Sequence, residues 1–455
     1  MGRESHLAAP APAPSAPGAG TGPGTPDVAR AAADVRALLD EIDGIGHDPQ
    51  HPEAGYHRSA WTAEDAQLRA WFTAQLARLG LTVETDRAGN LWGWWLPAGV
   101  DAPAGIAPAS AVTTGSHLDS VPGGGRFDGP LGVASALVAV ETLQRRGWTP
   151  ARPVGVVCFS DEEGARFRLA CFGSRVLTGV IAPGAALATA DEDGVTLATA
   201  LADAGIDTAA YGADAAQIGR IGAHVELHVE QGFALSPLGA PLGVASMIWP
   251  HGRWHVTLTG EANHAGTTPL ERRTDPMLPL ADLIQEARAA AEDAGGVATV
   301  GKVLITPNGV NVIPSRVDAW LDVRAPADDV LDAVLARLRR FGPRQESRTP
   351  ATVFTASVAD ALAAAAERVA GQDAPVIPTA AGHDAGILQD AGVPAGMVFV
   401  RSTTGASHTP AEDAADTDCG LGALTVAAAV AELAGSTAGT AAAVTLAPTA
   451  TEDAA

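Results

Sequence analysis

Two short apolar segments, separated by a segment of helical length, constrain the fold of this chain most strongly. Residues 110–117 (SAVTTGSH) and 153–164 (PVGVVCFSDEEG) each contain an apolar run and end in polar residues. Residues 131–146 between them have the length and composition of a helix. This order predicts a right-handed parallel strand–helix–strand crossover that is buried on both faces. Because sites in open sheets form at the carboxyl ends of the strands, we expect chemistry near His117 and Glu162.

A helix and a hairpin are expected before this unit. Thr62 can cap a helix that ends at Gly80 and has apolar residues at helical spacing, namely Leu68, Trp71, Phe72, Leu76 and Leu79. Residues 81–86 are expected to form a strand that turns at Gly89 and Asn90 into the strand LWGWW. We expect the tryptophans of this strand to pack in the interior rather than to contact a ligand; they are Trp92, Trp94 and Trp95.

The sequence pattern changes near residue 247. The elements expected from there are a strand at 253–262, a helix with Met277, Leu280, Leu283, Ile284 and Ala287 on one face, strands at 297–307 and 315–324, a helix with Val330, Val334, Leu335, Leu338 and Phe341, and a strand at 351–357. The order βαββαβ describes a small ferredoxin-like sandwich. We place it at 247–355, inserted into a larger domain at 31–246 and 356–435. The predicted class is α/β, with a mixed central sheet covered by helices on both faces.

Composition limits the partners and the compartment. The 52 acidic and 29 basic residues give a net charge of −23, which argues against nucleic acid or an anionic membrane as partner. Three cysteines are too few for a disulfide framework and indicate the cytoplasm; they are Cys158, Cys171 and Cys419. No stretch reaches the roughly 18 consecutive apolar residues of a membrane span. Residues 1–30 and 436–455 are expected to be disordered tails, and 1–30 lacks the apolar segment of a signal peptide.

An alternating segment at 224–232 (HVELHVEQG) brings titratable groups onto one face of a strand. The apolar residues Val225, Leu227 and Val229 share one face, and the opposite face carries His224, Glu226, His228 and Glu230. By itself, this pattern fits a solvated face as well as a site. Four titratable groups on the same face of one strand favour a functional site, since the whole chain has only 12 histidines.

Further candidate ligands surround this segment in the sequence. His117 and Asp128 flank a glycine run that can bend sharply, and Glu162 and Glu163 point in different directions from the end of a strand. A solvated acidic loop is the alternative for the glutamates, but buried carboxylates require a compensating cation. Histidines at 383 and 408 add imidazole donors. Oxygen and imidazole donors without thiolate favour Zn, Mn or Co.

At this point the sequence resembles the M20 amidohydrolases, specifically the branch of N-carbamoyl-L-amino acid hydrolases and allantoate amidohydrolases. The resemblance covers about residues 55–430. It rests on GSHLDSVPGGGRFDGPLGV, DEEGARF, ELHVEQG, HAGTTPLERRTD, NVIP, LDVR, GHDAG and GASHTPAE in this order. It implies a zinc-exopeptidase-like catalytic domain with a ferredoxin-like lid that also forms a homodimer.

The resemblance also implies a dinuclear centre with two divalent ions, Zn or Mn, per subunit. His117 and His228 would bind one ion, Glu163 and His408 the other, and Asp128 would bridge them. These five ligands come from segments spread over almost 300 residues of the chain.

Other roles follow from the same resemblance. Glu162 would be the general base, and Asp119 would orient His117, with an ordinary loop cap as its alternative. His264 would stabilise the oxyanion, in many members from the partner subunit. Gln231, Asn311 and Arg324 would bind the substrate, and Arg324 has a surface ion pair with Asp322 or Asp318 as its alternative. His383 is either a neighbour of the site or a structural histidine.

The implied activity is hydrolysis of a ureido (N-carbamoyl) C–N bond in a small carboxylate substrate, with release of ammonia and carbon dioxide. Allantoate and N-carbamoyl-L-amino acids share the groups that these motifs bind, although the texture around residues 89–95 slightly favours allantoate. An M20 aminoacylase or dipeptidase is the nearest alternative, but such relatives usually have an acidic ligand where this chain has His228. The alternative from another class is an inactive binding protein on the same fold.

Overall fold

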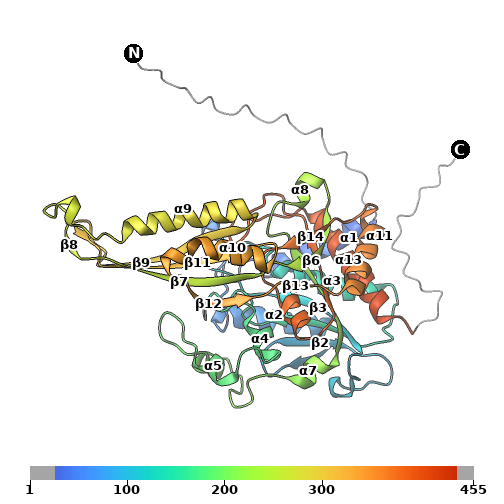
Figure 1. Ribbon diagram of the computed structural model, residues 1–455. Helices are drawn as coiled ribbons and strands as arrows, with labels where there is room; N and C mark the ends of the chain where they lie inside the picture. Colours follow the sequence, from blue (N-terminus) through green and yellow to red (C-terminus); the bar gives the residue numbers. More distant parts are fainter. Residues whose placement is uncertain (1–25, 438–455) are drawn as a thin grey trace.

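The computed structural model describes residues 26–437, and the chain forms a large and a small sheet within them (Figure 1). The large sheet has the strand order β1-β2-β4-β3-β5-β15-β6-β13, with β14 also paired to β6. Its strands are β1 Thr82–Thr85, β2 Leu91–Trp95, β3 Ala111–His117, β4 Val154–Phe159, β5 Ile221–Val229, β6 Leu242–Ile248, β13 Thr352–Val353, β14 Val376–Thr379 and β15 Ala395–Val400. β3, β4, β5 and β15 run parallel, and antiparallel strands flank them.

Helices cover both faces of this sheet. One face packs against α1 Pro26–Glu41, α2 Ala63–Arg78, α3 Pro130–Arg145, α11 Ala356–Ala370 and α13 Asp416–Ala434. The other packs against α4 Phe172–Leu177, α5 Pro183–Ala188, α6 Leu197–Asp203 and α12 Asp384–Asp390. Two short helices flank β5 in the sequence. α7 Ala215–Arg220 precedes this strand, and α8 Leu235–Leu238 follows it. The predicted α/β class with a mixed, doubly covered sheet is confirmed.

The local predictions for the first third of the chain are also confirmed. Thr62 caps α2 by accepting a hydrogen bond from the Asp65 N–H at 3.4 Å. β1 and β2 form the expected hairpin, and the indoles of Trp92 and Trp94 are buried in the interior. β3 and β4 pair in parallel and α3 connects them, as expected for the crossover. Every residue of both strands is buried, and the connecting helix is apolar on almost all sides.

The small sheet has the antiparallel order β12-β7-β11-β9. Its strands are β7 His251–Thr259, β9 Val297–Thr306, β11 Arg316–Arg324 and β12 Arg344–Thr349. α9 Met277–Ala294 and α10 Asp328–Leu338 pack on one face around their own apolar cluster. The sheet extends away from the large one, and its far tip carries β8 Asn263–His264, which pairs with β10 Val312–Ile313 (Figure 1). The order of elements is that of a ferredoxin-like sandwich.

The structure corrects two expectations from the sequence. The last strand of the small sheet is β12, whereas β13, within the expected strand 351–357, pairs with β6 of the large sheet. The sequence of β12, RQESRT, shows no apolar alternation because this edge strand contributes little to the core. Ile284 is exposed, since the buried stripe of α9 runs through Leu280, Leu283 and Ala287.

Residues 26–30 and Ser436, which were expected to belong to the tails, form regular structure. Helix α1 begins at Pro26, so residues 26–30 are helical rather than a tail. Ser436 forms an isolated bridge with Pro150. The rest of the two expected tails lies outside the described residues.

One helix of the described part, α13, is long and apolar enough to cross a membrane. However, 72% of its most apolar window is buried inside the fold. It packs between α1, α3 and α11 in the main core cluster. This is the environment of a core helix.

We predict that Gly115→Ala destabilises the protein. A Cβ at this position of β3 would lie 1.9 Å from the carbonyl oxygen of Val157 in β4, and the backbone φ is +149°. Overpacking of this kind typically costs about 1–3 kcal/mol. The midpoint of thermal unfolding should fall, whereas Gly301→Ala in β9, with no atom within 4 Å of its Cβ, should change it little. Equal midpoints for the two variants would contradict the close approach of β3 and β4.

Candidate metal centre and active site

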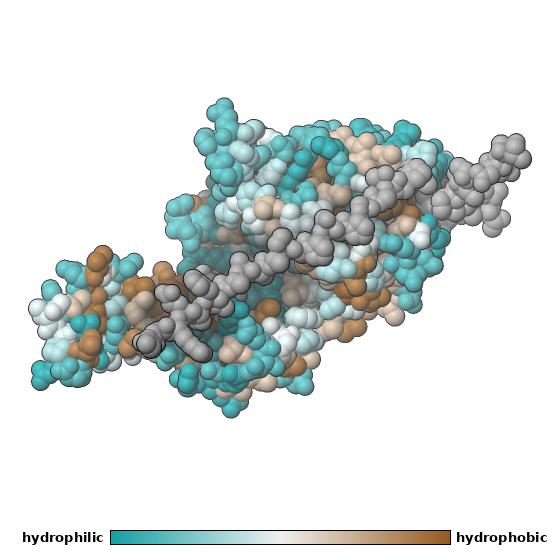
Figure 2. Space-filling model, turned by 90° about the horizontal axis from the view of Figure 1, so that it is seen from above, coloured by the Kyte–Doolittle hydropathy of each residue, from teal (hydrophilic) through white to brown (hydrophobic). Residues whose placement is uncertain are grey.

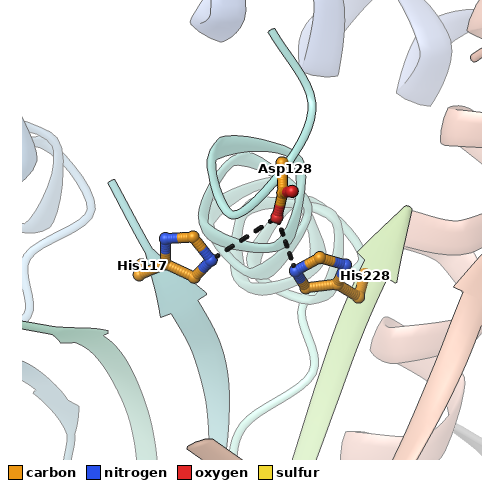
Figure 3. A group of neighbouring side chains, drawn as sticks. All are labelled: His117, Asp128 and His228. Atoms are coloured by element: carbon orange, nitrogen blue, oxygen red, sulfur yellow. Dashed lines mark ion pairs between the residues drawn. The ribbon is translucent and has the colours of Figure 1, made fainter. Parts of the chain in front are cut away.

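Three side chains meet at the carboxyl edge of the large sheet (Figure 3). His117 is the last residue of β3, His228 lies near the end of β5, and Asp128 precedes α3. Oδ1 of Asp128 lies 3.2 Å from Nε2 of His228 and 3.7 Å from Nε2 of His117. Both imidazoles point toward this one carboxylate oxygen (Figure 3). All three side chains are buried.

A second group forms around the other oxygen of the same carboxylate. Oδ2 of Asp128 lies 3.4 Å from Nε2 of His408. The same nitrogen lies 3.4 Å from Oε2 of Glu163. Within each of the two groups, one ligand atom per residue lies within 4.8 Å of the others. The structure therefore brings all five expected ligands together, with Asp128 common to both groups.

Hydrogen bonds to carbonyl groups orient the two histidines of the first group. Nδ1 of His117 lies 3.0 Å from the carbonyl oxygen of Asp119, and Nδ1 of His228 lies 2.9 Å from that of Val229. Because a carbonyl oxygen only accepts, each Nδ1 carries the proton when the ring is neutral. Each Nε2 then presents a lone pair toward Asp128, which is the arrangement of a metal-ligating histidine.

The buried nitrogen and carboxylate oxygen atoms of this cluster are suited to bind a divalent cation. Nε2 of His117 is buried without a hydrogen-bond partner. Burial, with the nearby charge of Asp128, raises the pKa of Glu163 to about 8. Burial also opposes ionisation of Asp128, but while the neighbouring imidazoles are protonated, the hydrogen bond from His228 and the positive charges of His117 and His408 outweigh it and hold the Asp128 pKa below its ordinary value. The nitrogen and oxygen donors fit Zn or Mn.

The Asp119 side chain makes the contacts of a loop cap, which was the alternative to orienting His117. Its carboxylate accepts hydrogen bonds from the N–H groups of Glu162 at 3.1 Å and Glu163 at 3.0 Å. Its Oδ1 is 3.5 Å from Nδ1 of His117, so the orienting hydrogen bond comes from its backbone carbonyl instead. The side chain thus holds the loop that carries the two glutamates.

Glu412 is a residue of the site that the sequence reasoning missed. Its Oε2 accepts hydrogen bonds from the N–H groups of Phe127 at 2.7 Å and Asp128 at 3.0 Å. Burial, with the charge of Asp128, raises the pKa of Glu412 to about 7. Its only signal in the sequence is its position four residues after His408 in GASHTPAED. It holds the backbone of the shared carboxylate in place.

Glu162 lies beside the first group. Its Oε2 is 3.7 Å from Nε2 of His117, and its Oε1 accepts a hydrogen bond from the Cys171 thiol at 3.2 Å. Burial raises the pKa of Glu162 above its ordinary value. The carboxyl group is therefore placed and tuned for proton transfer next to the ligand cluster.

A cavity of about 460 Å³ opens in front of these groups. Its lining combines four of the five ligands, all except His117, with four arginines, Arg175, Arg253, Arg324 and Arg348. Gln231 also lines it and donates a hydrogen bond from Nε2 to Oδ2 of Asp128 at 2.9 Å. The same lining holds four carboxyl groups, those of Asp128, Glu162, Glu163 and Asp322, so the cavity offers both acidic and basic side chains to a small polar molecule.

The other expected substrate residues divide into two groups. Arg324 lines the cavity. Its Nε also donates a hydrogen bond to Asp322 at 2.8 Å, so the ion pair that was the alternative to substrate binding is present as well. His264 and Asn311 lie at the exposed tip formed by β8 and β10, and neither lines the cavity. The structure does not bring them to the ligands of the same chain.

The face of β5 that carries the four titratable residues is not exposed to solvent, since both faces of this strand are buried. Of its four titratable residues, His228 alone lines the cavity. Nδ1 of His224 hydrogen bonds the Thr113 hydroxyl at 2.9 Å, and Glu226 accepts hydrogen bonds from Ser116 and the Ala385 N–H. His383 is a neighbour of the site, since its buried ring lines the cavity with its centroid 4.5 Å from that of His228.

We predict that Glu412→Ala weakens metal binding by roughly 10- to 100-fold, the usual effect of losing a group that supports a ligand. Glu412→Gln is the matched control, because its amide oxygen can still accept from the two N–H groups of the 127–128 backbone. Metal affinity would be measured by competition with a chromophoric chelator. Unchanged affinity in the Ala variant would show that this hydrogen-bond pair does not position Asp128.

Residues 113–432 match the sequence profile of peptidase family M20/M25/M40. N-carbamoyl-L-amino acid amidohydrolase of Geobacillus stearothermophilus is 37% identical over 403 residues, 85% of this chain and 95% of that protein. Allantoate amidohydrolase of Bacillus subtilis is 32% identical, over 86% of this chain and 96% of that protein.

The fold has relatives among solved structures as well. The crystal structure of an amidase of the hydantoinase/carbamoylase family from Burkholderia vietnamiensis superposes with a TM-score of 0.78 at 33% identity. The match covers 89% of this chain and 97% of that chain. The family resemblance inferred from the motifs is confirmed, and the chain belongs to peptidase family M20/M25/M40.

Proposed function

We propose that this chain hydrolyses the ureido C–N bond of a small carboxylate substrate, either allantoate or an N-carbamoyl-L-amino acid, with two divalent ions, Zn or Mn. The chain is a hydrolase of carbon–nitrogen bonds other than peptide bonds, as its relatives named for N-carbamoyl-L-amino acids and allantoate are. The observation that carries the proposal is the pair of ligand groups sharing Asp128, with Glu162 beside them in an arginine-lined cavity.

The residues divide the work of the reaction among them. His117, His228 and Asp128 would hold one ion, and Asp128, Glu163 and His408 the other. Bound there, divalent ions lower the pKa of water and polarise the ureido carbonyl. Glu162 accepts the proton of the attacking water at its carboxylate and passes it to the departing nitrogen. Ammonia, carbon dioxide and an amine-bearing acid are released.

The cavity's arginines supply the binding energy for the substrate carboxylate. Arg324 is held in place by its contacts to Asp322 and to the Ala380 carbonyl at 2.7 Å. A guanidinium fixed in this way meets a carboxylate with little loss of side-chain entropy. Gln231, which contacts Asp128, adds an amide to the lining of the same cavity.

We also propose a homodimer in the cytoplasm, formed through the small sheet and its helices. His264 lies at an exposed tip, far along the chain's own lid from the ligands, so a second copy would supply it to complete the oxyanion site. Apolar side chains gather at this narrow end of the molecule (Figure 2). They include Leu270, which is 78% exposed, and Leu278, which is 69% exposed.

Glu162→Gln tests the role of the base. The variant should bind metal like the wild type, because Glu162 lies outside both ligand groups, but its kcat should fall by about 100-fold or more without a general base. Metal content and ammonia release would be measured on the same preparations. Turnover near that of the wild type would show that Glu162 is not the base.

A panel of substrates tests the reaction itself. Ammonia release would be compared for allantoate, N-carbamoyl-L-amino acids and N-carbamoyl-β-alanine, beside release of amino acid from dipeptides and N-acetyl amino acids. Hydrolysis of ureido substrates alone supports the proposal. Hydrolysis of only the amide substrates would favour an aminoacylase or dipeptidase, and binding without any turnover an inactive protein.

Metal binding should release protons near neutral pH. In the metal-free protein the pKa of Glu163 is about 8, so this carboxyl is mostly protonated at neutral pH, whereas a ligand must be ionised. Metal affinity should therefore rise with pH, by up to about tenfold per pH unit per proton, and level off above about pH 8. Calorimetry in buffers of different ionisation enthalpy counts the protons. Affinity that is flat between about pH 6 and 8 would contradict this competition.

A further inference from the structure

A second cavity adjoins the one that faces the ligands. Its volume is about 690 Å³, and it shares Glu163, Arg253 and Asp322 with the first cavity. One wall is the loop after β4, including Gly164 and Ala165. The opposite wall is the face of the small sheet that carries no helices. The proposed reaction uses the first cavity only.

Strand β11 connects the two cavities. Its odd-numbered residues from 317 to 323 are buried against α9 and α10, so its even-numbered residues share the opposite face. Arg324 and Asp322 on this face line the first cavity, and Asp322 and Trp320 line the second. Because a strand rises about 3.3 Å per residue, Trp320 lies about 13 Å along the strand from Arg324.

Trp320 is a firmly held aromatic platform. The ring of His255 stacks on it with centroids 4.7 Å apart and an interplanar angle of 28°. The indole Nε1 donates a hydrogen bond to Glu346 at 3.3 Å. Nζ of Lys302 lies 5.3 Å from the centre of the indole. His255 on β7 and Lys302 on β9 are the cross-strand neighbours of Trp320, so the two faces of the indole differ. A planar group that stacks on the indole takes the face that the exposed Lys302 side chain covers, and the displaced ammonium group remains next to it.

Lys302 is the only lysine of the chain, and it is exposed. The arginines of the same cavity have carboxylate partners, since Arg168 lies 3.2 Å from Glu192 and Arg253 lies 3.8 Å from Asp322. Among the described residues, none places a carboxylate oxygen within 4.0 Å of Nζ of Lys302. In a protein of net charge −23, this leaves one cation of the cavity available to an anionic ligand.

We infer that the second cavity binds the side chain of the substrate, and that the preferred substrates are N-carbamoyl-L-amino acids with a planar side chain that ends in an anionic group. The inference rests on the proposed ureido hydrolysis. The ring stacks on Trp320 and the anion pairs with Lys302, while the ureido group lies at the ligand cluster. Allantoate bears only two ureido groups and a carboxylate on one carbon, so it does not fill this cavity.

Kinetics on three substrates test the assignment in the metal-loaded protein. N-carbamoyl-4-carboxy-L-phenylalanine carries ring and anion, N-carbamoyl-L-phenylalanine the ring alone, and N-carbamoyl-L-alanine neither. We expect kcat/KM to fall in this order. Lys302→Gln should reduce kcat/KM for the carboxylated substrate about tenfold and leave the alanine derivative within about twofold. Trp320→Leu should reduce both aromatic substrates.

Two further variants control for charge and for chemistry. Arg368→Gln removes an exposed cation on α11, outside both cavities and outside the small sheet, and should leave all three values unchanged. Lys302→Arg should retain most of the preference for the carboxylated substrate. Equal losses for all three substrates in Lys302→Gln, or no preference in the wild type beside clear hydrolysis of the alanine derivative, would overturn the inference.

The single lysine also allows a test that needs no turnover. Reductive ¹³C-methylation labels Lys302 and the terminal amine, and the Lys302 resonance is identified by its absence in Lys302→Gln. The carboxylated substrate should shift this resonance in metal-loaded Glu162→Gln, whereas N-carbamoyl-L-alanine should not. An unshifted resonance at saturating ligand would overturn the inference. If the wild type hydrolysed no ureido substrate, the proposed function would fail, and this titration would still decide whether the cavity binds the ligand.

Discussion

The buried carboxylate of Asp128 is the point on which the rest of this structure depends. One oxygen faces His117 and His228, and the other faces His408. Taking such groups out of water costs several kcal/mol per charge unless each is compensated. The protein compensates in part with the hydrogen bond from Gln231 to the Asp128 carboxylate, whereas Glu412, which binds the backbone of residues 127 and 128, adds a further acidic group. Two divalent ions would compensate the remaining charges, which links the stability of the cluster to its proposed chemistry.

The parallel sheet explains why these groups can meet at all. β3 and β5 are neighbours and run in the same direction, so His117 and His228 emerge at one edge. Asp128 precedes the N-terminus of α3, where the helix dipole favours negative charge. Carbonyl groups at the strand ends select the ring nitrogen that faces the carboxylate. Backbone geometry, more than side-chain contacts, therefore prepares the donors.

The small sheet is joined to this centre through β11. Its buried residues anchor it to α9 and α10, and its other face runs from the arginine-lined cavity to the platform of Trp320. In our proposals, this one strand provides both an anchor for the substrate carboxylate and a surface that selects the substrate side chain. The tip with His264 extends beyond both cavities, which is why the proposed oxyanion site requires a second copy of the chain.

Sequence patterns alone predict the elements whose periodicity matches their burial, namely the β1–β2 hairpin, the β3–α3–β4 crossover and helix α9. The sequence also predicts the five candidate ligands, because their motifs resemble a known family. The tertiary structure alone decided the roles of Glu412 and Asp119, since both act on backbone N–H groups distant in sequence. It also decided that β12, a polar edge strand, closes the small sheet and that Trp320 and Lys302 share a cavity. Local patterns record which side of an element is buried, but contacts between distant segments arise only when the chain packs.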